Sequence, residues 1–107
     1  KPIEHLRALS ASELYENKQK YVVLDVRTPR EWTEDGYIEG AKRVFFGHLQ
    51  QQAESIERNS RIAVICSTGR RATIGASILK RKGFIDVSTV LGSMTAWKNL
   101  GYPIKKD

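Results

Sequence analysis

Cys66, the single cysteine of this 107-residue chain, lies where two sequence patterns meet. Before it, residues 62–65 are continuously apolar and β-branched at three of four positions, which is typical of a central strand covered on both faces. After it comes a short polar turn formed by Ser67, Thr68, Gly69, Arg70 and Arg71. A helical pattern follows from Ala72 onward. The spacing therefore predicts a sulfur atom at the carboxyl end of a strand, facing the amino end of a helix.

This position favours the thiolate form of a cysteine. The unpaired N–H groups of a first helical turn point towards the sulfur, and the helix dipole favours negative charge there. Because the thiolate is the nucleophilic form, the pattern indicates a reactive cysteine. The alternative is a small apolar filler, which is the common role of a buried free cysteine. A filler, however, does not need a glycine and two arginines directly after it.

A second polar group lies at the end of another apolar stretch. Residues 21–26 are typical of a buried strand, and Asp25 and Arg27 stand at its carboxyl end. In open α/β sheets, ligands bind outside the carboxyl ends of the strands, so this group would share an edge with Cys66. A buried carboxylate is unfavourable unless it is paired. We expect Asp25 and Arg27 to form a bonded cluster that supports neighbouring loops, with a direct catalytic role as the alternative.

Length and composition restrict the class of protein. Residues 1–107 are enough for one domain with its own core. One cysteine excludes an intrachain disulfide, and His5 and His48 are too far from Cys66 in sequence to suggest a zinc site. We expect no metal and no cofactor. No apolar run is long enough to span a membrane and no signal-peptide pattern opens the sequence, so the expected location is cytoplasmic, without membrane contact.

The net charge of +6 favours anionic partners. Nucleic acid is one such partner, but the basic residues are dispersed and no aromatic-interleaved basic stripe or recognition helix is present. The cluster at 80–82 suits the carboxyl end of a helix that Gly83 terminates. We therefore expect a small anionic partner rather than nucleic acid.

Strand and helix patterns alternate along the chain. Apolar strand patterns cover 21–26, 43–46, 62–66 and 86–91. Helical patterns cover about 10–17, a stretch beginning at 28, and then 47–58, 71–81 and 93–100. Ser10 and Thr28 are the N-caps of the first two helices. This alternation predicts an α/β fold with a largely parallel sheet and helices on both faces.

Four stretches, in order, resemble signatures of the rhodanese family of sulfurtransferase domains. They are Leu24-Asp-Val-Arg-Thr-Pro-Arg-Glu-Trp32, Gly36-Tyr-Ile-Glu-Gly-Ala41, Cys66-Ser-Thr-Gly-Arg-Arg71, and a closing set of Leu91-Gly-Ser93, Ala96-Trp97 and Gly101-Tyr-Pro103. The third stretch is similar to the Cys-x-x-Gly-x-Arg active-site loop of single-domain members. The resemblance covers nearly the whole chain and implies a mostly parallel five-stranded sheet with helices on both faces.

The resemblance also implies sulfur transfer through a persulfide. The Cys66 thiolate would attack the outer sulfur of thiosulfate or of a persulfide, hold it as a Cys66 persulfide, and pass it to a thiol or to cyanide. Backbone N–H groups of the loop would surround the terminal sulfur. Arg71, assisted by Arg70, would attract the anionic donor, because a planar guanidinium suits an oxyanion. The substrate-binding residues would be Ser67, Thr68, Gly69, Arg70 and Arg71.

The chain departs from the family pattern in two places. Tyr37 and Glu39 replace the usual histidine and proline of a structural segment, which affects local loop shape. Ser93 stands where a second glycine is common, so serine carries strain there if the site requires a positive φ.

Two rival interpretations also depend on Cys66. A cysteine-based phosphatase or arsenate reductase uses a Cys-x5-Arg loop, whereas Ala72 is the sixth residue after Cys66. The shorter loop suits a single sulfur atom or a sulfur oxyanion better than phosphate. The other rival is a persulfide relay or regulatory domain of a larger protein, with a protein as sulfur donor or acceptor. Turnover of thiosulfate with cyanide distinguishes a free enzyme from such a relay.

Overall fold

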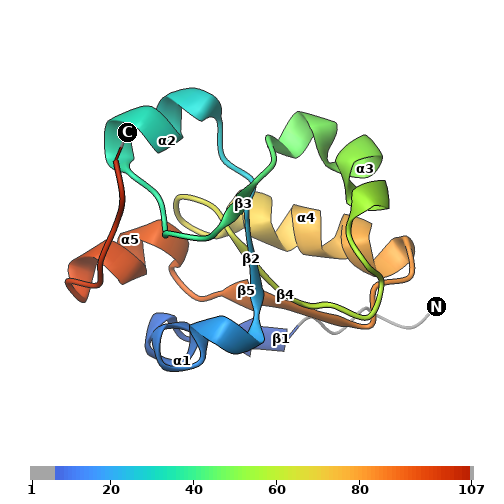
Figure 1. The fold of residues 1–107 in the computed structure, drawn as a ribbon, viewed down its shortest axis with the longest axis horizontal. Coiled ribbons are helices and arrows are strands. Elements are labelled where there is room, and N and C mark those ends of the chain that lie inside the picture. Colours follow the sequence, from blue (N-terminus) through green and yellow to red (C-terminus); the bar gives the residue numbers. More distant parts are fainter. Residues whose placement is uncertain (1–6, 107) are drawn as a thin grey trace.

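The computed structural model describes residues 7–106 and contains a five-stranded parallel sheet. The strands are β1 (Arg7–Leu9), β2 (Val22–Asp25), β3 (Lys42–Arg43), β4 (Arg61–Ile65) and β5 (Asp86–Val90). Their order across the sheet is β1-β5-β4-β2-β3, and each neighbouring pair is parallel. The predicted α/β class is therefore confirmed, with a sheet that is parallel throughout rather than mostly so (Figure 1).

Within residues 7–106, five α-helices and three short 3₁₀ helices connect and cover the strands. They are α1 (Ala11–Glu16), α2 (Pro29–Asp35), α3 (Leu49–Gln52), α4 (Arg70–Arg81), α5 (Ser93–Asn99), η1 (Lys18–Lys20), η2 (Phe46–His48) and η3 (Ala53–Ser55). The two predicted N-caps are confirmed. Ser10 and Thr28 each begin a capping box in which the hydroxyl accepts a backbone N–H and a glutamate three residues later returns the bond.

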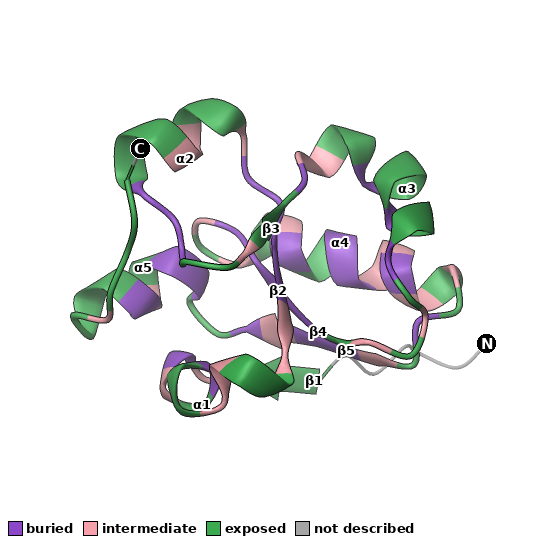
Figure 2. Cartoon of the chain, viewed as in Figure 1, coloured by how far each residue is buried: buried purple, intermediate pink, exposed green. Residues whose placement is uncertain are grey.

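Alternating side chains of the central strand enter two separate apolar clusters. Ile62 and Val64 of β4 face α3 and α4, whereas Ala63 and Ile65 face α1 and α5. This follows from the period of two in a strand, and it explains why 62–65 is apolar at every position. Figure 2 shows the buried central strands between these two helical layers.

One strand was not predicted from its residues, and two predicted elements differ from the structure. The residues of β1 did not predict a strand, because two of its three side chains are exposed and it therefore lacks an apolar strand pattern. The strand predicted at 43–46 is confined to β3, after which the chain turns into η2. The α-helix predicted at 47–58 is confined to α3, with η2 before it and η3 after it. The Arg58 guanidinium donates to the carbonyls of Ala53 and Ile56 at 3.3 and 3.2 Å, which replaces further helical bonding there.

The sheet topology concentrates the polar strand ends at one place. β2 leads outward to β3, whereas its neighbour β4 leads to β5 on the other side. Adjacent strands whose connections diverge form a topological switch point, where ligands of α/β proteins bind beyond the carboxyl ends. Cys66 directly follows β4, and Asp25 ends β2. No helix within residues 7–106 is long and apolar enough to cross a membrane.

Candidate active site at the end of β4

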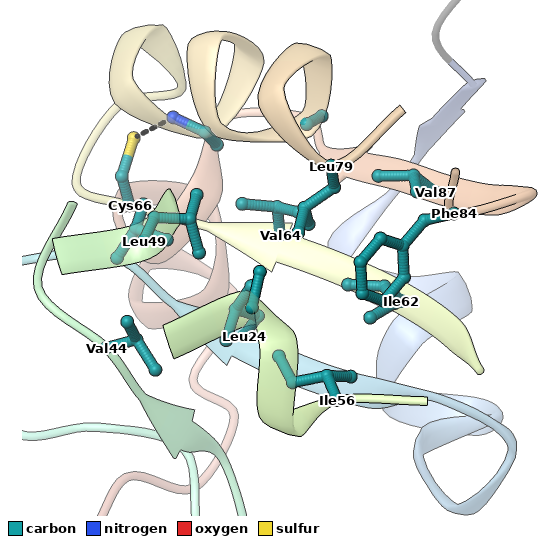
Figure 3. Packing of buried hydrophobic residues seen from close by; sticks show 14 residues of the cluster. Leu24, Val44, Leu49, Ile56, Ile62, Val64, Cys66, Leu79, Phe84 and Val87 are labelled. Atoms are coloured by element: carbon teal, nitrogen blue, oxygen red, sulfur yellow. Dashed lines mark hydrogen bonds between the residues drawn. The ribbon is translucent and has the colours of Figure 1, made fainter. Parts of the chain in front are cut away.

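Cys66 is held with its sulfur over the first turn of α4. Its Sγ accepts hydrogen bonds from the N–H of Gly69 at 3.0 Å and from the N–H of Ala72 at 3.3 Å. Figure 3 shows the sulfur pointing to the start of the helix, with the second bond as a dashed line. Gly69 has a φ of +123°, a conformation that side chains rarely permit. The glycine thus allows the turn to bring its own amide beneath the sulfur.

The remaining amides of this loop are open. The backbone N–H groups of Ser67, Thr68, Arg70 and Arg71 have no hydrogen-bond acceptor within residues 7–106. Successive free N–H groups at a turn and a helix start create a local positive potential that attracts anions. The Ala72 donor lies one residue beyond the predicted loop, and its position in the first helical turn is the signal that could have found it.

Arg71 is paired with a carboxylate that lies 40 positions earlier in the sequence. Its two terminal nitrogens donate to the two carboxylate oxygens of Glu31 at 2.7 and 2.8 Å. The Arg71 hydrogen bonds, supported by those from Thr28, lower the pKa of Glu31 from 4.5 to about 2. The same pair raises the pKa of Arg71. This bidentate pair ties α2 to the first turn of α4 beside the nucleophile.

Arg70 differs from its neighbour in that it is exposed and pairs with no side chain in the described part of the chain. With Thr68 and Gly69 it lines a hollow between α4 and the end of β5. Ser67 and Thr68 present hydroxyls that make no hydrogen bond to any residue from 7 to 106. The predicted loop therefore offers one guanidinium and two hydroxyls that are unpaired within residues 7–106.

Asp25 and Arg27 form a buried ion pair. Only 1% of each side chain is exposed, and Arg27 Nη2 lies 2.7 Å from Asp25 Oδ2. The same Nη2 donates to the Gly36 carbonyl at 2.8 Å, and Arg27 Nε donates to Asp25 Oδ1 at 2.9 Å. The pair joins the end of β2 to the loop after α2. No hydrogen bond connects it to Cys66 within the described residues, so it borders the site without contacting the sulfur.

The start of α5 holds the backbone of the nucleophile. The Cys66 N–H donates to Ser93 Oγ at 3.2 Å, and the Cys66 carbonyl accepts from the Met94 N–H at 2.9 Å. The Ser67 carbonyl accepts from the N–H of Thr95 at 3.0 Å. None of these contacts had a local signal in the sequence. Among residues 7–106, no group of three or more His, Cys, Asp or Glu side chains is placed to hold a metal ion.

Comparison with known sequences identifies a protein family. Residues 10–100 match the sequence model of the family described as Rhodanese-like domain. YrkF of Bacillus subtilis, named as a candidate sulfur carrier protein, is 33% identical over 75 residues, or 70% of this chain. The chain covers only 40% of that relative. The thiosulfate sulfurtransferase GlpE of Pseudoalteromonas translucida is 27% identical over 95 residues, or 89% of each chain.

Comparison with solved structures agrees with this result. A rhodanese-related protein from Thermoplasma volcanium superposes with a TM-score of 0.88 at 33% identity, over 94% of this chain and 99% of that one. A Rhodopseudomonas palustris protein described as a possible tyrosine phosphatase superposes with a TM-score of 0.84, over 94% and 85% of the two chains. Its identity is 23%, so this second likeness shows the fold alone.

Proposed function

The chain belongs to the rhodanese-like domain family, and we propose that it is a sulfurtransferase that carries sulfane sulfur as a persulfide on Cys66. One observation carries the proposal. The Cys66 sulfur accepts two backbone N–H groups at the start of α4, and four further amides of the same loop have no acceptor within residues 7–106. Such a loop stabilises a thiolate before the reaction and an additional sulfur anion after it.

In the first step, the Cys66 thiolate attacks the outer sulfur of the donor. With thiosulfate, the new bond joins Sγ to the outer sulfur, and the sulfur–sulfur bond of the donor breaks with its electron pair leaving on sulfite. Cys66 then carries a terminal sulfur anion, so the negative charge is conserved. Because only 1% of Cys66 is exposed, the donor must present its sulfur on a slender end, as thiosulfate and persulfides do.

In the second step, the acceptor takes the outer sulfur. Cyanide attacks the terminal sulfur, the persulfide bond breaks, and its electron pair returns to Sγ as the thiolate while thiocyanate leaves. A thiol acceptor reacts as its thiolate and becomes a persulfide itself. The open amides of Ser67, Thr68, Arg70 and Arg71 are the donors that support the terminal sulfur between the two steps.

The two arginines have different roles in this proposal. Arg70 is the exposed cation and attracts the anionic donor to the loop. Arg71 is bound through both terminal nitrogens to Glu31, so we do not expect it to bind the donor directly. Its role is to add positive potential beside the loop and to fix the first turn of α4. Asp25 and Arg27 support the strand end beside the loop.

Intact-protein mass spectrometry after thiosulfate treatment tests this function. Wild type should gain the mass of one sulfur atom and lose it again when cyanide is added, with thiocyanate appearing in solution. The matched control is Cys66→Ser, which keeps the size of the side chain and should gain nothing. Sulfur gain by Cys66→Ser would remove Cys66 from the mechanism.

A persulfide relay is the second candidate, since one relative is named as a candidate sulfur carrier. A relay would gain sulfur from a protein persulfide but not from thiosulfate, and its cyanide turnover would be slow. Hydrolysis of p-nitrophenyl phosphate by wild type, and not by Cys66→Ser, would instead favour phosphatase chemistry and contradict both sulfur-transfer candidates.

A further inference from the structure

We propose that Ser93 is a positioning residue for the nucleophile, and that its hydroxyl keeps the Cys66 side chain aimed at the amides of α4. Ser93 lies 27 positions away in sequence, at the first residue of α5. Its side chain is completely buried, and its Oγ lies 3.9 Å from Cys66 Sγ. It is therefore the buried hydroxyl beside the reacting sulfur.

Ser93 adopts a backbone conformation that serine disfavours. Its φ is +48°, and it is the one non-glycine residue with a positive φ in the described chain. Gly92 before it is also left-handed, at +71°, so two such residues in succession turn the chain from β5 towards the cysteine. Glycine adopts this conformation without strain, whereas serine does not. Strain of this kind persists where surrounding contacts enforce it, and it commonly accompanies function.

At this position serine provides a hydroxyl group that glycine would lack. Ser93 Oγ accepts the Cys66 N–H at 3.2 Å and donates to the Val90 carbonyl at 3.2 Å. The hydroxyl proton is thus directed to β5, which leaves an oxygen lone pair for the cysteine amide. Without this acceptor, the Cys66 N–H would be buried and unpaired, because it donates no other hydrogen bond among the described residues.

The bond to Ser93 acts with its neighbours on both sides of the nucleophile. The Met94 N–H donates to the Cys66 carbonyl and the Thr95 N–H donates to the Ser67 carbonyl, so three consecutive residues of α5 bind the backbone of two consecutive residues of the loop. Of these bonds, the one to Ser93 Oγ involves the amide nitrogen that is bonded directly to the Cys66 Cα. It restricts rotation of the backbone about that residue and so keeps Sγ within reach of Gly69 and Ala72.

Two substitutions separate positioning from stability. Ser93→Ala removes the hydroxyl and keeps the strain, whereas Ser93→Gly removes both, so Ser93→Gly should melt at least about 4 °C above Ser93→Ala. Both variants should lose the fixed orientation of the Cys66 side chain to the same extent. In each, the Hα–Hβ NMR couplings of Cys66 should change from single-rotamer to averaged values, and sulfur uptake from thiosulfate should slow about tenfold or more. Ser88→Ala is the matched control, because Ser88 is also a buried serine, 4% exposed, but lies in the middle of β5.

A purely structural role predicts a different pattern, in which the rate of sulfur uptake follows the melting temperature. Ser93→Gly would then take up sulfur faster than Ser93→Ala. That pattern, or Cys66 couplings in Ser93→Gly equal to those of wild type and Ser88→Ala, would overturn the proposal. The uptake measurement rests on the proposed function, but the couplings do not. If wild type takes up no sulfur, the sulfurtransferase proposal fails, and the couplings still decide whether Ser93 positions Cys66.

Discussion

Replacement of Glu31 by glutamine tests whether the ion pair across the site contributes to the structure as its geometry indicates. Glu31 occupies the third position of α2, where its carboxylate also completes the capping box begun by Thr28. Glutamine can complete the same box, so Glu31→Gln retains the helix start and removes the charge that Arg71 binds. The substitution thereby isolates the link between α2 and α4.

The expected loss of stability follows from the pair's geometry and exposure. The two hydrogen bonds measure 2.7 and 2.8 Å, and the pKa of Glu31 is lowered from 4.5 to about 2. A lowering of that size corresponds to at most about 3–4 kcal/mol of folding free energy. Solvent reaches 26% of the Glu31 side chain and 32% of the Arg71 side chain, which screens the attraction. We therefore expect Glu31→Gln to reduce the free energy of unfolding by about 1–2 kcal/mol at pH 7.

The pH dependence of this loss has a definite sign. The folded-state pKa of Glu31 is below its unfolded value, so its stabilising contribution is complete above pH 4.5 and declines as the pH falls towards 2. The difference between wild type and Glu31→Gln should be constant from pH 7 to about pH 5, and should fall to roughly half or less by about pH 3. The neutral variant lacks this acid-sensitive contribution.

Urea denaturation at several pH values measures the difference directly. Glu34→Gln is the matched control, because Glu34 lies on the same helix and pairs with Arg30 in an exposed i,i+4 bridge. That control should lose less than about 0.5 kcal/mol. Equal losses for Glu31→Gln and Glu34→Gln at pH 7, or a Glu31→Gln loss that persists unchanged at pH 3, would refute the reasoning.

Three further predictions concern other parts of the site. Asp25→Asn leaves the buried Arg27 guanidinium without its charge partner and should reduce unfolding free energy by about 3–5 kcal/mol in urea titrations; a loss below about 1 kcal/mol would contradict the burial of the pair. Gly69→Ala places a Cβ in open space but at a φ of +123°, so calorimetry should show a loss of about 1–2 kcal/mol from backbone strain alone, and an unchanged Tm would argue against this turn. Arg70→Gln should raise the KM for thiosulfate about three- to tenfold with little change in Tm, and an equal KM would show that this cation does not attract the donor.

The strands of the sheet differ in how far local sequence could locate them. β4 was predictable because its residues face apolar helices on both sides, which imposes an uninterrupted apolar pattern. β1 was not, since most of it is exposed and its place in the sheet depends on pairing with β5, where Leu9 is opposite Val90. The break after α3 likewise depends on Arg58, whose contacts form only in the folded chain.

The same distinction applies to the site. Sequence alone determined the local part, the turn from Cys66 to Arg71, because the end of a strand, a left-handed glycine and the start of a helix lie within a few consecutive residues. Only the tertiary structure decided which distant groups meet that turn. Glu31 lies 40 positions before its partner Arg71, and Ser93 lies 27 positions after Cys66. Their side chains reach the loop because parallel strand pairing brings the ends of β2, β4 and β5 to one edge, and that pairing is a property of the whole sheet rather than of any one segment.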